Sequence, residues 1–291
     1  MNLIRSAMPD VPPAAHGPEE LRAPSEWRCV DIISDLHLQP SEPATFDAWR
    51  AFLRGQVSGA PNQLPVADAL LILGDLFEVW VGDDALSSNE DPAAAFWREC
   101  ADALAERARS GPVFFMAGNR DFLLGPLASE RMGWQVLSDP TVLCMGTQRT
   151  LLSHGDALCT DDTDYQAFRH TVRQADWQHH FLSQSLSERL RVARELRVRS
   201  QARKDSQGHD PSLWADVDHS AAAQWLEGAD AHMLIHGHTH RPGQHQWTGP
   251  NGQMLERQVL SDWELSGEQP RCEVLRLHVS GELTRWRPEA L

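Results

Sequence analysis

Five short clusters of polar side chains carry residue types that can bind metal ions and activate water, and four of the five contain a glycine. Carboxylate and amide oxygens and imidazole nitrogens suit divalent cations, and none of the clusters contains a cysteine that would favour zinc or iron–sulfur chemistry. If two cations shared one carboxylate, seven side chains would give each four ligands and leave positions for water and phosphate oxygens. The candidate ligands are Asp35, His37, Asp75, Asn119, His154, His236 and His238.

Each cluster taken alone has an ordinary explanation. An Asp-x-His or Gly-Asp pair after an apolar run is most often a turn, and Gly118–Asp121 could be a turn with Asn119 in a left-handed conformation. The strongest single signal is His-Gly-His-Thr-His. Residues two apart on an extended segment point to one side, so we expect His236 and His238 to reach the same metal pair. The five clusters in this order favour one metal centre over five separate turns.

The elements that must position these clusters are short apolar runs, one directly before each cluster. Runs of three to five apolar residues bounded by such breakers predict strands that are buried on both faces. Between the first runs lie helical patterns, with Phe46, Trp49 and Phe52 three residues apart, and with Asp91-Pro92 as cap and first turn for 93–109. The alternation predicts an α/β fold whose ligands bind beyond the carboxyl ends of the strands. The runs are 30–33, 69–73, 113–117, 150–152 and 232–235.

Composition excludes several classes of protein. The formal net charge of -15 argues against binding nucleic acid through the overall field of the molecule. Five scattered cysteines without CxxC spacing are typical of a reducing compartment, so we expect a cytoplasmic protein. No run approaches the 18 or more apolar residues that span a bilayer, and membrane association would therefore be peripheral.

The chain divides into three kinds of segment. Residues 1–26 contain five prolines and are predicted to be a disordered Pro/Ala-rich extension. Residues 27–159 and 229–291 form the predicted core, in which short strands between 254 and 286 complete a second sheet. Residues 160–228 interrupt the alternation with a long helical stretch rich in arginine and are predicted to be an inserted cap.

The five clusters, in this order, resemble the motifs of the calcineurin-like metallophosphoesterase family, and the resemblance covers residues 28 to about 265. It implies a two-sheet β-sandwich flanked by helices, here with a helical insertion as cap. It also implies Asp35, His37, Asp75 and His238 on one metal, and Asp75, Asn119, His154 and His236 on the other, with Asp75 as the bridge. Asp75, Asn119, Arg120 and His236 are the expected catalytic residues.

The third motif departs from the family pattern, which usually reads Gly-Asn-His. Arg120 stands where that histidine helps the leaving group depart. A serine alkoxide benefits from a general acid, whereas a phosphate monoester leaving a pyrophosphate is already a stable anion. An arginine that neutralises charge then suffices. The substitution therefore favours anhydride cleavage over protein dephosphorylation.

Longer stretches at 73–84, 118–125, 154–169 and 235–242 are similar to the UDP-2,3-diacylglucosamine diphosphatase family of lipid A biosynthesis. The resemblance implies two divalent ions, usually Mn²⁺, hydrolysis of the substrate's pyrophosphate by an activated hydroxide, and peripheral attachment to the cytoplasmic face of the inner membrane. It implies substrate contacts at Asn119, Arg120, Asp162, Ser200 and His236. Lys204 and Gln207 stand where the family carries an asparagine and a lysine. Together with Tyr165 and Arg197 of the insertion, these residues are the substrate-binding candidates.

The composition of the insertion suits a diacylated sugar nucleotide. Such a substrate needs an apolar slot beside a polar site, although ordinary helix packing explains apolar side chains equally well. Residues 187–204 hold seven basic residues against two glutamates, a net charge of +5 that favours an anionic leaflet or, alternatively, a solvated helix face. The slot candidates are Tyr165, Phe168, Trp177, Phe181, Leu182 and Leu186.

Two other functions are compatible with these patterns. One is a soluble nucleotide pyrophosphatase or phosphodiesterase of the same fold, against which the apolar insertion argues. The other is a non-catalytic scaffold, whose signature would be the loss of one or more ligands, and none of the seven is missing. We expect a lipid-linked sugar nucleotide and the membrane surface as partners, and neither nucleic acid nor an obligate protein partner.

Overall fold

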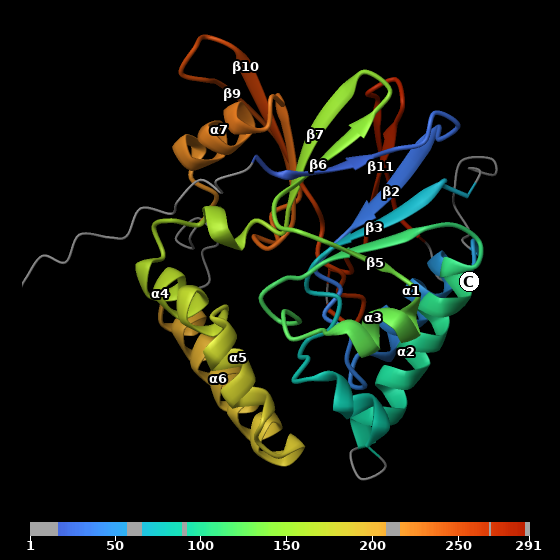
Figure 1. Cartoon of the computed structure of the whole chain (residues 1–291), viewed down its shortest axis with the longest axis vertical. Coiled ribbons are helices and arrows are strands. Elements are labelled where there is room, and N and C mark those ends of the chain that lie inside the picture. Colours follow the sequence, from blue (N-terminus) through green and yellow to red (C-terminus); the bar gives the residue numbers. More distant parts are fainter. Residues whose placement is uncertain (1–16, 57–65, 89–91, 208–215, 268, 289–291) are drawn as a thin grey trace, which may run out of the picture.

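Two six-stranded sheets lie face to face in the computed structural model, with helices on their outer faces (Figure 1). The structure describes residues 17–56, 66–88, 92–207, 216–267 and 269–288, without the side chains of residues 92 and 199–207. Within these ranges no helix has the length and apolar character needed to cross a bilayer. The predicted two-sheet sandwich flanked by helices is confirmed.

The first sheet contains three of the five strands that precede the polar clusters. Parallel pairing joins β2, β3, β4 and β5, while β11 runs antiparallel to β2 and to β12. Every residue of β2, β3 and β4 is buried, as the apolar runs predict, and the one charged residue among them, Asp31, accepts from Arg276 of β11. Its strands, in spatial order, are β12 (Leu283–Trp286), β11 (Val274–His278), β2 (Cys29–Ile33), β3 (Ala69–Leu73), β4 (Val113–Met116) and β5 (Gln135–Leu137).

The second sheet contains the other two strands that precede polar clusters, β7 and β8. In it β7 and β8 are parallel neighbours, and β10 pairs with β8. The prediction of a disordered extension is wrong for residues 17–26, because β1 pairs in parallel with β6 and Leu21 packs into the core; residues 1–16 lie outside the described part. Its strands, in spatial order, are β1 (Glu19–Arg22), β6 (Thr141–Met145), β7 (Gln148–Ser153), β8 (Met233–His236), β10 (Met254–Val259) and β9 (Gly243–Thr248).

The space between the sheets is an apolar core built from alternate residues of the strands. Side chains such as Ile32 and Leu71 from one sheet meet Leu152 and Ile235 from the other. The intervening residue Ile33 points to the opposite face of its sheet and packs beneath the helices. This alternation explains why the strands show no polar face in the sequence.

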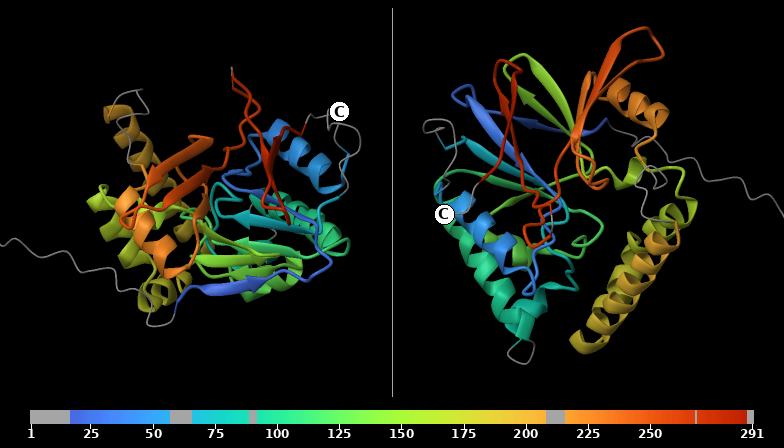
Figure 2. Two further views of the ribbon diagram at one scale, coloured as in Figure 1. Left: turned by 90° about the horizontal axis from the view of Figure 1, so that it is seen from above. Right: turned by 180° about the vertical axis from the view of Figure 1, so that it is seen from behind.

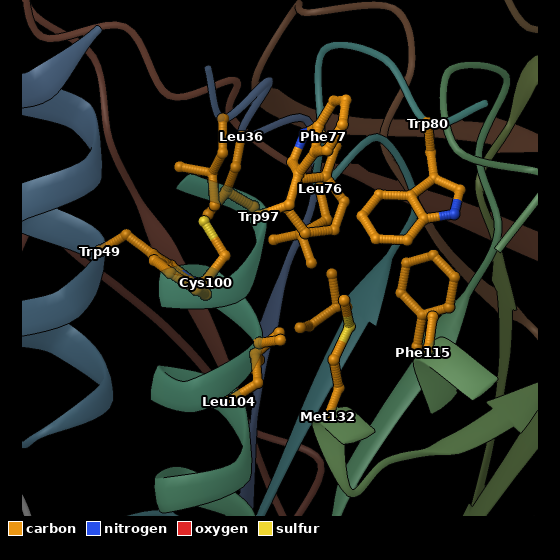
Figure 3. Close-up of a cluster of buried hydrophobic side chains, with 14 of the residues drawn as sticks. Leu36, Trp49, Leu76, Phe77, Trp80, Trp97, Cys100, Leu104, Phe115 and Met132 are labelled. Atoms are coloured by element: carbon orange, nitrogen blue, oxygen red, sulfur yellow. The ribbon is translucent and has the colours of Figure 1, made fainter. Parts of the chain in front are cut away.

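Helices α1 (Pro43–Leu53), α2 (Pro92–Ala108) and α3 (Pro126–Met132) cover the outer face of the first sheet. Figure 3 shows the cluster beneath them, in which Trp49 of α1 and Trp97 of α2 gather with Phe115 of β4 and with Leu36, Leu76 and Phe77 of the loops after β2 and β3. Phe46, Trp49 and Phe52 are all buried on α1, which confirms the helix predicted from their spacing. The stacked rings of Phe115 and Trp134, 4.3 Å between centroids, extend the cluster.

Helix α7 (His219–Gly228) covers the outer face of the second sheet. Ala222 and Leu226 pack there against Leu151 and Leu234 of the sheet. The predicted insertion of residues 160–228 is therefore not a single cap. Its last helix belongs to the sandwich, because the apolar face of α7 is buried on β7 and β8.

The remaining helices of the insertion form the cap, defined here as α4 (Thr163–Val172), α5 (Ala175–Leu182) and α6 (Leu186–Gln207). They run beside one another and stand apart from α1 and α2 (Figures 1 and 2). Arg189 anchors α6 to the loop after β3, since its guanidinium, only 1% exposed, donates to Val81 O and to both carboxylate oxygens of Asp84.

Candidate metal centre

The loops after β2, β3, β7 and β8 are tied together by backbone hydrogen bonds. The amide of Asp35 donates to Gly74 O at 3.1 Å, and the amide of Gly237 donates to His154 O at 3.0 Å. The two sheets are linked where the amide of His238 donates to Asp35 Oδ2 at 2.9 Å. Because the strands of both sheets end here, their polar clusters meet at one edge of the sandwich, as predicted.

Five residues of the polar clusters have a strained backbone conformation. Their φ angles lie between 49° and 65°, in the left-handed region that residues other than glycine seldom adopt. Such a conformation costs about 1 to 3 kcal/mol per residue and persists only where the surroundings enforce it. Strain concentrated in this way is typical of a functional site. The five residues are Asp35, His37, Asp75, His238 and His240.

Two glycines of the motifs lie so close to aspartate side chains that a larger residue would not fit. A Cβ on Gly118 would lie 2.2 Å from Asp75 Oδ1, and a Cβ on Gly237 would lie 2.2 Å from Asp35 Oδ2. Any larger residue would push a carboxylate out of the cluster. The glycines of the third and fifth motifs therefore make room for the aspartates.

One group of ligand atoms comes from Asp35, His37 and His240, with atoms of all three within 4.8 Å of one another. His240 Nε2 lies 3.4 Å from Asp35 Oδ1 and 3.2 Å from His37 Nε2. Sequence reasoning assigned His240 no role. The pattern that could have indicated His240 is the even spacing of His236, His238 and His240 in the sequence.

The second group comes from Asp35, Asp75 and His154, also within 4.8 Å. His154 Nε2 lies 3.7 Å from Asp75 Oδ1 and 3.1 Å from Asn119 Oδ1. The Asn119 oxygen also lies 2.9 Å from His238 Nδ1. Six of the seven predicted ligands are thus brought together, with Asp35 and Asp75 in the middle.

No hydrogen bond or ion pair among the described residues joins the His236 ring to this cluster. Its Nδ1 lies 2.9 Å from Gly237 O, and its buried Nε2 has no hydrogen-bond partner among the described residues. The prediction that His236 and His238 act together assumed an extended chain. β8 ends at His236, and left-handed backbone conformations follow at His238 and His240. The His240 ring lies beside Asp35, whereas Nδ1 of His238 lies 2.9 Å from Asn119 Oδ1. A buried imidazole nitrogen without a partner suits a metal ligand, so His236 stays a predicted ligand, and His240 is an additional candidate.

The buried charges influence one another strongly. Burial alone would lower the pKa of His154, but the carboxylates of Asp75 and Asp35 raise it to about 9. Burial and the neighbouring His154 lower the pKa of His238 to about 4. Although burial opposes ionisation of Asp35, contact with His240 and the other histidines holds the pKa of that carboxyl well below its usual value. Buried carboxylates, an amide oxygen and imidazoles form a donor set that fits divalent cations.

Two buried aspartates that sequence reasoning passed over hold the loops in place. Asp121 accepts the amides of Leu76 and Gly118, both at 2.8 Å, and so fixes the loop after β3 against the loop after β4. Burial and the charge of Asp75 raise the pKa of Asp121 to about 7. Asp156 accepts the Tyr165 hydroxyl at 2.6 Å and aims that ring beside His238, 5.8 Å between centroids.

Glu78 is a third acid that sequence reasoning passed over. It is 8% exposed and lies close to His37, Arg120 and Arg197. Burial would raise the pKa of Glu78, but the contact with His37 and the two arginines lowers it to about 2. No local pattern reveals this role, because its partners lie on three other segments.

A cavity of about 610 Å³ opens from the cluster into the space between the sandwich and the cap. Its polar end is lined by Asn119, Arg120, Asp162 and His238, and its apolar end by aromatic rings of both layers. Of the predicted slot residues, Tyr165, Phe168, Trp177 and Phe181 line it, whereas Leu182 and Leu186 do not.

The substrate-contact candidates separate into three groups. Arg197 lines the cavity together with the polar residues named above and Tyr165. His236 does not line it. The side chains of Ser200, Lys204 and Gln207 lie outside the described part of the chain.

Comparisons with known proteins show the family to which the chain belongs. The family model for calcineurin-like phosphoesterases matches residues 30–242. The UDP-2,3-diacylglucosamine hydrolase of Xanthomonas oryzae pv. oryzae (strain PXO99A) is 45% identical over 256 residues, which cover 86% of this chain and 95% of that protein. The relative of the same name from Stenotrophomonas maltophilia (strain R551-3) is 43% identical over 258 residues, with the same coverage. Among solved structures, Vps29 of Entamoeba histolytica with zinc is 14% identical, with a TM-score of 0.40, 89% of this chain covered and 97% of that one. The chain therefore belongs to the calcineurin-like phosphoesterase family and, within it, to the family of the UDP-2,3-diacylglucosamine hydrolases.

Proposed function

We propose that the protein hydrolyses the pyrophosphate bond of UDP-2,3-diacylglucosamine to UMP and 2,3-diacylglucosamine 1-phosphate, a step of lipid A biosynthesis. The observation that carries this proposal is the cavity of about 610 Å³, which joins a cluster of metal-ligand side chains to an apolar slot. A substrate with a pyrophosphate at one end and two acyl chains at the other needs both. The names of the relatives point to the same substrate.

The expected cofactor is a pair of divalent cations, most suitably Mn²⁺, which oxygen and imidazole ligands accept. In the arrangement of contacts, Asp35, His37 and His240 would hold one ion and Asn119, His154 and His238 the other, with the unpaired Nε2 of His236 as a further donor. Asp75 would serve both, because its carboxylate lies 4.0 Å from His37 Nε2 and 3.7 Å from His154 Nε2. When bound, such ions lower the pKa of a water molecule and neutralise phosphate charge.

Arg120 and Asn119 would bind the phosphoryl oxygens. Both line the polar end of the cavity, and the amide of Arg120 donates to Asp75 Oδ1 at 2.8 Å, which fixes the arginine beside the cluster. The guanidinium is always charged and offers donors in a fork that matches phosphate. The leaving group is a stable phosphate anion, so neutralising its charge is enough.

The apolar end of the cavity would hold the acyl chains. Phe168, Trp177 and Phe181 of the cap line it together with Trp80 and Phe122 of the sandwich. The rings of Trp177 and Phe181 are stacked, 4.9 Å between centroids, and make a flat apolar wall. Burial of hydrocarbon against such surfaces contributes about 0.8 kcal/mol per methylene.

We also propose peripheral attachment to the cytoplasmic face of the inner membrane, where the lipid substrate would be met. The cap presents three exposed apolar side chains: Phe168 (39%), Leu182 (41%) and Val198 (67%). Basic residues of α6 would add attraction to anionic lipid. Arg189 does not contribute, because it is buried in the anchor to Asp84.

The proposal is tested by incubating the protein with Mn²⁺ and three substrates, namely UDP-2,3-diacylglucosamine, UDP-glucose and an aryl phosphodiester. We expect UMP to be released from the lipid alone, and rapid cleavage of UDP-glucose would indicate a soluble pyrophosphatase instead. Phe168→Ala should raise the KM for the lipid without changing the affinity for Mn²⁺. The matched control is Leu127→Ala, which removes an exposed apolar side chain outside the cavity.

A further inference from the structure

The carboxylate of Glu78 lies between the metal-ligand cluster and the cap. Its Oε2 is 3.0 Å from His37 Nδ1, in the loop after β2. Its Oε1 is 3.0 Å from Arg197 Nε on α6 and 3.7 Å from Arg120 Nη1 in the loop after β4. One side chain therefore contacts a candidate metal ligand, a phosphate-binding candidate and the cap.

The backbone of Glu78 is held independently of these contacts. Its amide donates to Leu38 O at 3.2 Å, and the preceding Phe77 is fully buried and bridged to Leu38. Two residues later, the amide of Trp80 donates to Arg120 O at 3.0 Å. The carboxylate is thus a fixed point, whereas Arg197 reaches it from a helix that joins the sandwich elsewhere.

The two oxygens of Glu78 serve different partners. The contact at Nδ1 leaves the other nitrogen of His37 facing Asp75 and His240. A carboxylate on the outer nitrogen of a metal-binding histidine fixes the ring and raises its basicity. On the other oxygen, a single negative charge faces two guanidinium groups, so positive charge remains at the mouth of the cavity to attract an anion.

We propose, on the basis of the function proposed above, that Glu78 is a positioning residue that links the cap to the metal cluster. Through Oε2 it orients His37 toward the cation. Through Oε1 it holds Arg197, and with it the inner side of α6, at the place where the substrate's phosphate meets Arg120. Substrate affinity and metal affinity therefore both depend on this carboxylate, whereas Arg197 affects substrate affinity alone.

The experiment compares the full-length parent with E78Q, R197A and the double variant. Glutamine keeps the shape of the side chain and removes its charge. The matched control is E195Q. Glu195 lies on α6, as Arg197 does, and among its described contacts it pairs only with the exposed Arg191. Mn²⁺ affinity is measured by calorimetry, KM and kcat with UDP-2,3-diacylglucosamine, and folding by thermal unfolding.

We expect E78Q to bind Mn²⁺ about tenfold to a hundredfold more weakly and to show a higher KM. R197A should raise KM with parental Mn²⁺ affinity, and it should raise KM less in the E78Q background than in the parent, because the two residues act together. E78D, which restores the charge at shorter reach, should recover part of the Mn²⁺ affinity. E195Q should match the parent in every measurement.

Parental Mn²⁺ affinity in E78Q, or independent effects of E78Q and R197A on KM, would overturn the proposal. The calorimetric comparison needs no turnover. A parent that binds Mn²⁺ but leaves the lipid intact would refute the proposed function, while the E78Q titration would still decide whether Glu78 orients His37.

Discussion

His37 and His240 lie 203 residues apart in the chain, and their Nε2 atoms are 3.2 Å apart at the edge of the sandwich. Two imidazole nitrogens at this distance share at most one proton, and both face the carboxylate of Asp35 or Asp75. Such convergence of ring nitrogens and carboxylates suits a cation between them. This relationship adds His240 to the candidate ligand set.

The first prediction tests two histidines, His236 and His240. His240→Ala should weaken Mn²⁺ binding at least tenfold, because a ring of the cluster is lost. His236→Leu should also weaken it at least tenfold, because the buried Nε2 of His236 has no hydrogen-bond partner among the described residues and is available to a cation. Isothermal titration calorimetry of both variants checks this. Parental affinity in either variant would remove that histidine from the ligand set.

Asp75→Asn should abolish most turnover, since both halves of the cluster lose a carboxylate. Metal ions supply several kcal/mol of stabilisation in phosphate chemistry, so kcat should fall by more than roughly a hundredfold. Steady-state kinetics with Mn²⁺ measure the loss. The control is Asp47→Asn, an exposed position on α1, which should behave like the parent. Near-parental activity in the Asp75 variant would contradict its bridging role.

Arg189→Ala should loosen the cap without unfolding the sandwich. Removal of this buried guanidinium leaves Asp84 and two backbone carbonyls without their donor. Breaking a buried ion pair costs about 3 to 5 kcal/mol of stability. Because the Asp84 side chain is more than half exposed, we expect a cost at the lower end of this range. Hydrogen exchange of the α6 amides should accelerate accordingly. Arg191→Ala, which removes only exposed pairs with Glu188 and Glu195, should change exchange little.

The ion pair between Asp216 and Arg257 should make stability depend on pH. Burial would raise the pKa of Asp216, but two contacts of 2.8 Å with Arg257 lower it below its usual value. A depressed pKa means that the stabilisation is complete above the unfolded pKa of about 3.9 and is lost as the pH falls toward the folded value.

Asp216→Asn should therefore lower the free energy of unfolding by about 1 to 3 kcal/mol at pH 7 and by less as the pH is lowered from 5 to 3. Urea unfolding of parent and variant across this range measures the difference. A gap that stays constant with pH would show that the charge of Asp216 is not the cause.

Much of the fold could be predicted because local patterns encode it. The apolar runs at 30–33 and 69–73 became β2 and β3, and the spacing of Phe46, Trp49 and Phe52 became α1. Residues 17–26 were misjudged, because β1 is stabilised by pairing with a strand more than 100 residues away rather than by its own composition. Helix α7 was misassigned to the cap because its amphipathic pattern does not say which surface it covers.

The sequence by itself determined the chemistry: carboxylates, an amide and imidazoles stand directly after buried strands, and Arg120 replaces a histidine. These properties are local, because the residue types and the ends of the strands can be predicted from short segments of sequence. Only the tertiary structure brought His240 beside Asp35, because left-handed turns at His238 and His240 redirect the chain after β8. The contacts of Glu78 with His37, Arg120 and Arg197 were also visible only in the tertiary structure, because these partners come from three segments that fold together but share no local pattern.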